Sequence, residues 1–158
     1  MKIIFKIFTL CALLAGFSAC NKQEPEVEQP LEVNYVNLHG TWKLEKLGGK
    51  PVGDEVYCYI ELSRGDHSFK MYDNFGSMYA RLNTGKFQID FDEREGSRIS
   101  GTYDYGLGKW NNEYLITELM PSGTMVWTNV DMAEDVQKFV RCDKVPDEIV
   151  EEARQIKK

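Results

Sequence analysis

Side chains that could carry chemistry are few in this chain of 158 residues, and they are scattered along it. The only histidines are His39 and His67, and neither belongs to a cluster of Cys, Asp or Glu at metal-site spacing. No Gly-x-Ser-x-Gly, Walker or dinucleotide-binding motif occurs. The sequence therefore predicts no catalytic residue, no metal, no cofactor and no enzyme. Arg64-Gly65-Asp66 is expected to be an ordinary hairpin turn, because Gly and Asp favour turns.

The composition is that of one acidic, soluble-type domain. Lys and Arg number 19 against 25 Asp and Glu, which gives a formal charge of -6. Such a charge argues against nucleic acid as a partner, because phosphate backbones attract basic surfaces. The 42% of hydrophobic residues can supply a single core. Nothing in these numbers identifies a protein partner.

The first 19 residues have the pattern of a secretory signal peptide. A basic start precedes an apolar stretch that is too short to span a membrane. The end of this segment, Phe17-Ser18-Ala19-Cys20, resembles a bacterial lipobox. That resemblance implies cleavage before Cys20 and a membrane anchor of two or three acyl chains on it. Asn21 favours the outer membrane, and the sequence leaves the periplasmic and surface faces open.

Residues 20–36 comprise the cysteine expected to be lipidated and a segment rich in Glu, Gln, Pro and Asn that is expected to form a flexible linker. Residues 37–144 then alternate apolar and polar side chains in short segments bounded by turn residues. The strand-like segments are 39–47, 56–62, 68–72, 85–91, 98–105, 113–119, 124–128 and 136–142.

Eight short segments joined by tight turns predict an all-β fold, an eight-stranded antiparallel up-and-down barrel without exposed edges. The last segment, residues 145–158, has acids first, bases last and an apolar stripe. It is predicted to be an amphipathic helix that packs on the barrel wall, with partner binding as the alternative role.

Three residues relate this barrel to a family. Gly40 and Trp42 open the first strand, and Arg141 lies in the last one. This pattern resembles the lipocalins, and together with the leader it resembles the small lipocalin-like lipoproteins of gut Bacteroidetes. The resemblance implies that Trp42 closes the base of the barrel and that the Arg141 guanidinium packs across the indole. Gly40 would allow close approach of the backbone there.

The strand alternation predicts which side chains face the barrel interior. Two alternatives remain open for this interior: it could be an ordinary filled core, or it could line a pocket for one small ligand. The candidate lining residues are Phe69, Met71, Phe87, Ile89, Phe91, Tyr103, Tyr114, Ile116, Met125 and Trp127.

Cys58 and Cys142 also leave two alternatives, since neighbouring strands could bring them into a disulfide or each could be a free thiol.

The function expected from these features is binding of a small hydrophobic or amphipathic ligand by a lipid-anchored, lipocalin-like protein of the cell envelope. This expectation rests on fold analogy. The alternative is a filled barrel that acts as an envelope interaction module through its loops or its terminal helix. An enzymatic barrel would require Tyr, His and Asp side chains clustered at one mouth.

Overall fold

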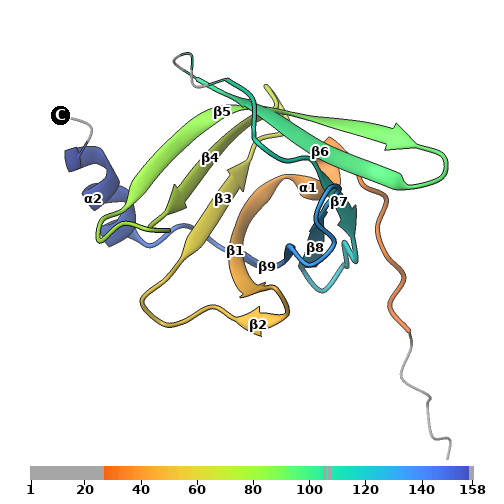
Figure 1. Cartoon of the computed structure of the whole chain (residues 1–158), viewed down its shortest axis with the longest axis horizontal. Helices are drawn as coiled ribbons and strands as arrows, with labels where there is room; N and C mark the ends of the chain where they lie inside the picture. The colour runs from red at the N-terminus through yellow and green to blue at the C-terminus, as the bar shows by residue number, and fades with distance from the viewer. Residues whose placement is uncertain (1–26, 105, 107, 157–158) are drawn as a thin grey trace, which may run out of the picture.

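The computed structural model describes residues 27–104, 106 and 108–156, and within them the chain forms a closed β-barrel (Figure 1). Each long strand is antiparallel to the next one along the chain, and β1 also pairs with β9, which closes the sheet. The predicted eight-stranded barrel with a C-terminal helix is therefore confirmed. Its strands are β1 (Gly40–Leu47), β3 (Cys58–Leu62), β4 (Ser68–Asp73), β5 (Arg81–Asp92), β6 (Gly96–Tyr103), β7 (Tyr114–Thr117), β8 (Thr124–Asn129) and β9 (Val136–Cys142). A two-residue strand, β2 (Lys50–Pro51), pairs with the end of β1.

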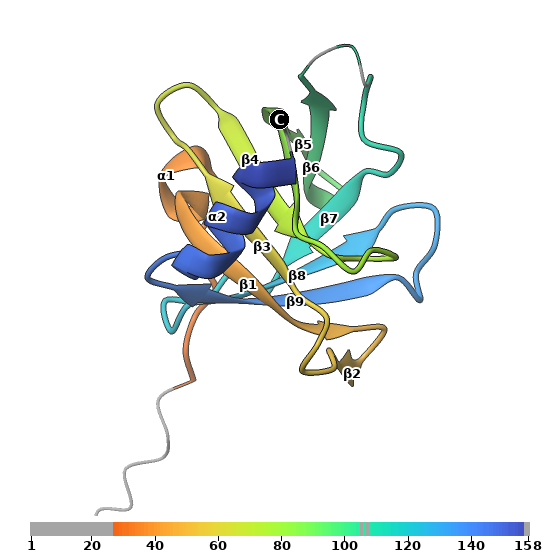
Figure 2. The same cartoon turned by 90° about the vertical axis from the view of Figure 1, so that its left-hand side faces the viewer.

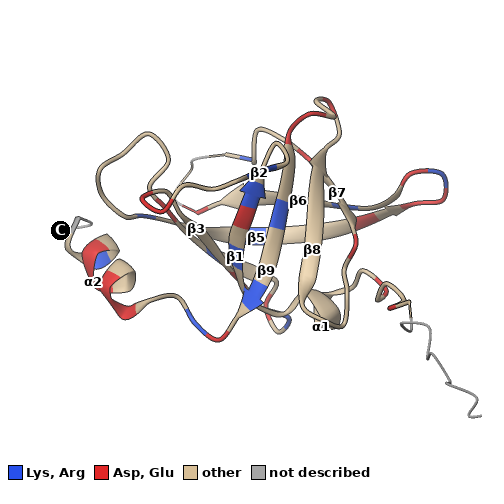
Figure 3. Cartoon of the chain, turned by 90° about the horizontal axis from the view of Figure 1, so that it is seen from below, with Lys and Arg blue, Asp and Glu red and all other residues tan. Residues whose placement is uncertain are grey.

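Alternation along the strands sorts the side chains into an apolar interior and a charged exterior. In β1, Trp42 and Leu44 are buried whereas Lys43 and Glu45 are exposed. The outer ion pair between Lys138 and Glu45 joins β9 to β1, with 3.1 Å between nitrogen and oxygen. Figure 3 shows where charged residues lie along β1, β9 and α2. Burial of the opposite face supplies the main driving force for closing the sheet.

One end of the barrel is capped by a short helical turn, α1 (Tyr35–Leu38), which the sequence patterns did not predict. The side chain of Asn34 caps it by accepting hydrogen bonds from the backbone of Val36 and Asn37. Just before it, the Leu31 amide donates to the Leu119 carbonyl at 2.7 Å. These contacts extend the packed part of the chain into the predicted linker, and they place α1 and the described N-terminal residues at one end (Figure 2).

The C-terminal helix, α2 (Asp147–Ile156), lies on the outer wall of the barrel as the apolar stripe predicted. Its buried side chains Ile149 and Ala153 pack against Tyr59 and Tyr72 of β3 and β4. The two tyrosines face outward because their strand neighbours on either side face the interior. The helix therefore covers an apolar strip of the wall that water would otherwise contact.

The prediction that Phe91 faces the barrel interior is wrong. The alternation of β5 does bury Phe87, but β5 and β6 extend as a hairpin beyond the barrel (Figure 1). Phe91 lies near the end of this extension and is 74% exposed. A period of two identifies the face of a strand, and it does not show where the opposite wall of the barrel ends.

Cys58 and Cys142 are free thiols, so the disulfide alternative does not hold. The pairing of β1 with both neighbours explains why. Trp42 lies opposite both Ile60 and Arg141, so Cys58, two residues before Ile60, points inward, whereas Cys142, one residue after Arg141, points outward. Side chains on opposite faces of the wall cannot form a disulfide.

Candidate functional site: a cavity at the barrel mouth

The candidate site is a cavity at the end of the barrel opposite α1. It has a volume of about 240 Å³. Figure 2 shows the loops of this end, β6–β7 and β8–β9, on the side away from α1. The lining residues come from β3, β4, β6, β7, β8 and β9 and from two loops: Cys58, Ile60, Met71, Phe75, Tyr103, Trp110, Asn111, Asn112, Tyr114, Trp127 and Gln137. Of these described residues, none carries a formal charge.

The predicted interior residues divide between this cavity and a filled core. Four of them line the cavity: Met71, Tyr103, Tyr114 and Trp127. The remaining interior ones belong to the packed core or contact it without lining the cavity: Phe69, Phe87, Ile89, Ile116 and Met125. The barrel is thus packed in one part and hollow in another, so the two alternatives for the interior each describe part of it.

Aromatic rings form much of the cavity wall. Trp127 is 1% exposed, and its ring centroid lies 5.7 Å from that of Tyr114 and 4.9 Å from that of Phe139. The Trp110 ring lies 6.0 Å from Trp127 and 5.0 Å from Phe69. Such spacings are typical of stabilising tilted and edge-to-face aromatic pairs. The cavity is therefore lined by rings that already pack against each other.

Trp110 is one of seven lining residues that were not predicted to line the interior; the others are Cys58, Ile60, Phe75, Asn111, Asn112 and Gln137. Trp110 lies in the loop between β6 and β7, which pair through only Arg98–Leu115 and Ile99–Tyr114. The ring enters the barrel over Gly101, where an added Cβ would be 2.4 Å from it. Only glycine leaves room for an indole against the strand at this point. A glycine inside a strand followed by tryptophan in a glycine-rich loop is the signal that could have indicated this packing.

Two lining residues carry a buried hydrogen-bond donor that has no partner among the described residues. The indole nitrogens of Trp110 and Trp127 are both buried and find no acceptor among the described residues. The Tyr114 hydroxyl, by contrast, accepts hydrogen bonds from the side-chain amides of Asn112 at 3.2 Å and Gln137 at 3.3 Å. A buried N–H without an acceptor is costly, so these two indoles are unusual features of the wall.

The ionisable groups of the wall are held neutral by burial. Desolvation raises the pKa of Tyr103 and of Tyr114 above the ordinary phenol value. Desolvation likewise raises the pKa of the Cys58 thiol, and the nearby Asp73 carboxylate adds to that effect. At neutral pH the cavity therefore presents phenol, thiol, amide and indole groups, all uncharged.

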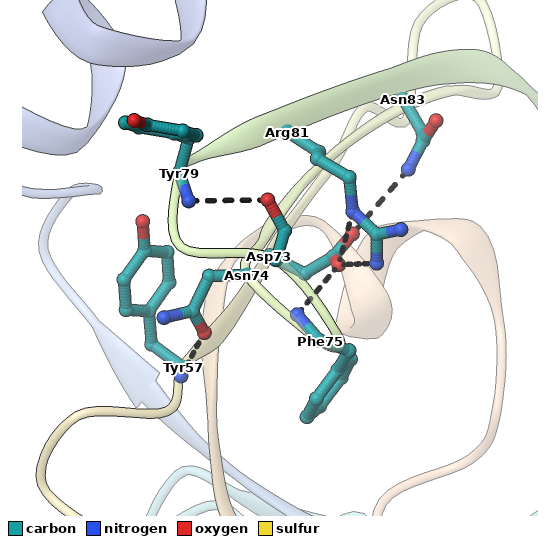
Figure 4. Close-up of polar contacts among 8 residues, drawn as sticks. Tyr57, Asp73, Asn74, Phe75, Tyr79, Arg81 and Asn83 are labelled. Atoms are coloured by element: carbon teal, nitrogen blue, oxygen red, sulfur yellow. Dashed lines mark hydrogen bonds and ion pairs between the residues drawn. The ribbon is translucent and has the colours of Figure 1, made fainter.

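A polar cluster lies beside the cavity at the end of β4 (Figure 4). The Asp73 carboxylate is 2% exposed and accepts hydrogen bonds from the Arg81 guanidinium, from the Asn83 amide at 3.3 Å and from the Phe75 backbone at 3.2 Å. With its charge paired and its oxygens occupied, Asp73 is satisfied in place. The cluster fixes the loop that carries Phe75, a cavity-lining residue, and so holds one side of the mouth.

The closed end contains Gly40, Trp42 and Arg141, the three residues that resemble the lipocalin pattern. The Trp42 ring is fully buried, and its indole N–H donates to the Leu38 carbonyl at 2.9 Å. The Arg141 guanidinium lies 4.2 Å from the centroid of that ring and donates to the carbonyls of His39 and Asn37 at 2.6 and 2.8 Å. The contact is worth about 0.5–1 kcal/mol, since the Arg141 side chain stays exposed.

Gly40 is required at this end for a steric reason. Its φ is +135°, and a Cβ there would lie 2.3 Å from the Arg141 guanidinium nitrogen. Any other residue would displace the guanidinium from the indole and strain the backbone.

Other hollows and ionisable groups of the described residues do not form a comparable site. Grooves of about 410 and 470 Å³ lie outside the barrel and include exposed charged side chains such as Lys43, Glu45 and Lys70. His39 and His67 are both exposed, and the His67 ring stacks on Tyr35 with 3.6 Å between centroids. In the described part of the chain, no three His, Cys, Asp or Glu side chains are grouped to hold a metal.

Cys20 and the predicted signal peptide lie outside the described residues. Among the helices that are described, none has the length and apolar character needed to cross a bilayer.

Comparison with known proteins does not place the chain in a family, so its fold is the only basis for classifying it. No protein-family model matches the chain, and no curated protein matches it. The closed antiparallel barrel with its C-terminal helix is compatible with a lipocalin-like fold.

Proposed function

We propose that this protein binds a small hydrophobic or amphipathic molecule in the mouth of its barrel. The observation that carries this proposal is the cavity of about 240 Å³, enclosed by rings of Tyr103, Tyr114, Trp110 and Trp127 and by a few amides. Ligand sites typically combine an apolar wall with a few placed polar groups. Cavities near 150 Å³ hold benzene, so this one fits a molecule of about ten non-hydrogen atoms.

We also propose that the protein acts at the cell envelope, anchored through lipid on Cys20. This part rests on the leader and on the cysteine that follows small residues in it. Two or more acyl chains hold a protein stably in a bilayer. The barrel would then be a tethered receptor or carrier at a bacterial outer membrane. The proposed activity is non-covalent binding, without catalysis.

Native mass spectrometry tests the binding proposal. The protein is purified from its own cells without detergent, in lipid nanodiscs, and released into the gas phase under gentle conditions. A reproducible adduct of a small molecule supports the proposal. The Trp127→Ala variant supplies the control, because it changes the cavity wall and should alter the adduct. A protein that is consistently free of adduct and binds no member of a small-molecule library contradicts the proposal.

A second candidate function, an interaction module, has one observation in its favour. The β5–β6 hairpin carries the exposed Phe91 beyond the barrel, and a groove of about 320 Å³ runs between it and the segment 32–35. Exposed aromatics of this kind are frequent at protein interfaces. If the protein acts mainly as an interaction module, Phe91→Ser abolishes its activity in cells, whereas Tyr114→Phe in the cavity leaves that activity intact. The opposite pattern favours the ligand-binding proposal.

A further inference from the structure

The mouth cavity combines accessible aromatic rings with an acidic surround, and this pairing narrows the class of ligand. We propose that the cavity binds a quaternary ammonium group of the choline type and holds the cation by cation–π contact with its rings. This inference rests on the proposed binding function and adds the chemistry of recognition to it. A quaternary nitrogen bears no N–H, so it requires no hydrogen-bond acceptor in the wall.

Several rings of the cavity wall remain accessible to a ligand. Four lining aromatics are half-buried, whereas Trp127 is only 1% exposed. The four come from the β4–β5 loop, β6, the β6–β7 loop and β7: Phe75, Tyr103, Trp110 and Tyr114. Rings that border one cavity from several elements form the kind of cage that binds quaternary ammonium groups, because each negative ring face attracts the cation.

The Trp110 indole lies flat against the wall, so one of its faces is turned inward. A Cβ added at Gly101 would lie 2.4 Å from Cε2 of the ring, and 2.7 and 2.8 Å from Nε1 and Cδ2, the two atoms bonded to Cε2 on the pyrrole side. These distances place the Cβ directly above the ring plane and not beside the ring edge. Gly101 shares the inward face of β6 with the buried Ile99. The opposite face of the indole therefore points toward the interior, where Trp110 lines the cavity.

Negative charge is concentrated at the mouth end of the barrel. The four loops there, residues 48–57, 74–80, 104–113 and 130–135, hold seven Asp or Glu against two Lys, a formal charge of -5. The three hairpin loops of the closed end, residues 63–67, 93–95 and 118–123, hold four Asp or Glu against two Arg, which gives -2. A mouth with one sign of charge raises the local concentration of ions of the opposite sign. This mouth therefore attracts cations and repels anions.

No Lys, Arg or His among the described residues lines the cavity to oppose a cation. Lys109 lines a separate hollow of about 150 Å³, and the Arg81 guanidinium is bonded to the buried Asp73 carboxylate. The wall phenols are consistent with a negative potential. Beyond desolvation, which is the main cause, the Asp73 charge raises the pKa of Tyr103. Tyr103 stays protonated at neutral pH, so its ring is an uncharged cation–π partner.

The test compares choline with its neutral isostere dimethylbutanol, in which carbon replaces the quaternary nitrogen. Both probes are small enough for a cavity of about 240 Å³. Isothermal titration calorimetry measures their affinities for the full chain in nanodiscs of lipids without choline headgroups, with empty nanodiscs as the blank. Choline is expected to bind at least about fivefold more tightly than the isostere. Raised salt is expected to weaken the binding of choline more than that of the isostere.

A quaternary ammonium group can come from a free molecule or from a lipid headgroup. Glycerophosphocholine carries the group beside a phosphate, as a headgroup does. The acidic mouth repels the phosphate, so choline is expected to bind more tightly than glycerophosphocholine. The reverse order would assign the site to headgroups, and either order supports recognition of the ammonium.

A matched pair of variants at Tyr103 separates recognition from packing. Tyr103→Leu keeps apolar bulk and removes the ring, so the ratio of choline to isostere affinity is expected to fall by at least about threefold. Tyr103→Phe keeps the ring and is expected to keep the ratio. A merely structural role of Tyr103 would weaken both probes equally.

A second ring and a distant ring complete the set of variants. Trp110→Leu is expected to lower the same ratio, and it decides the question if Tyr103→Leu fails to fold. Phe91→Leu removes an exposed ring outside the cavity and should leave the ratio unchanged. Thermal melting of each variant identifies any that fails to fold.

Four results would overturn the inference: equal binding of choline and its isostere, an equal response of both probes to salt, an unchanged affinity ratio in the folded ring variants, or no binding of any ammonium probe. None of them removes the proposed function, which depends on the adduct in the mass spectrum and is compatible with a neutral ligand. An apo mass with no library hit, conversely, would remove the function itself. The two failures are therefore distinguishable.

Discussion

Replacing Trp42 by alanine removes the centre of the closed end and provides a direct test of how the barrel is held together. The side chain is 0% exposed, belongs to the main core and donates one hydrogen bond to the Leu38 carbonyl. Truncation of a buried tryptophan costs about 3–5 kcal/mol through lost burial and the cavity that remains. The Leu38 carbonyl and the Arg141 guanidinium also lose their partner in the indole. The free energy of unfolding is therefore expected to fall by at least about 3 kcal/mol.

Urea denaturation and thermal melting followed by far-UV circular dichroism measure this loss. For a fold of this size, the melting temperature is expected to fall by about 10–20 °C. Trp42→Phe should be milder, because it keeps most of the apolar volume and loses the hydrogen bond, at a cost of about 1–3 kcal/mol. Phe91→Ala is the control, since it truncates an exposed aromatic ring and should change stability by less than about 0.5 kcal/mol. Near-wild-type melting of Trp42→Ala would refute the assignment of Trp42 to the barrel base.

Three further predictions concern charge, thiols and anchoring. The hydrogen bond from Lys86 to Asp66 holds the pKa of that carboxyl well below its ordinary value, so Asp66 adds stability above the unfolded pKa that is lost as pH falls through the folded pKa. In low salt, the free energy of unfolding of Asp66→Asn should therefore decrease less steeply below about pH 4 than that of the wild type. The same decrease in both proteins would contradict this prediction. Buried Cys58 should react with iodoacetamide only after unfolding, whereas half-buried Cys142 should react slowly in the native protein; peptide mapping of labelled sites decides it. Cys20→Ala should release the protein from the membrane fraction, and its retention there in carbonate-washed membranes would refute lipidation.

Much of the architecture could be predicted because most strands have one buried and one solvated face. Segments such as β1 and β8 alternate cleanly, and each predicted segment corresponds to a strand of the barrel. The first part of β5 was missed, because Arg81–Thr84 has no apolar alternation and pairs with β4 through its backbone. The turn α1 was missed because one helical turn has little intrinsic stability and depends on the Asn34 cap and on tertiary packing.

The candidate site was predictable only in part, for a different reason. Interior positions such as Tyr114 and Trp127 follow from strand period, but whether an interior side chain fills the core or borders a cavity depends on packing across the barrel. Trp110 comes from a loop and reaches the site through the space over Gly101, a fit that strand alternation does not encode. Phe91 shows the reverse case, in which a clean local pattern continues past the end of the barrel.

The attachment of the N-terminal segment beside α1 determines how a tethered barrel would be oriented. The Leu31 amide is bonded to Leu119, and the Glu28 carboxylate accepts from the Ser122 amide at 2.5 Å, both at the closed end. Only residues 21–26 separate Cys20 from the described chain, a reach of at most about 25 Å. An acylated Cys20 would therefore keep the closed end toward the bilayer and turn the mouth toward the aqueous side. A ligand would then enter and leave the cavity from the aqueous phase, and the bilayer would serve only to anchor the protein.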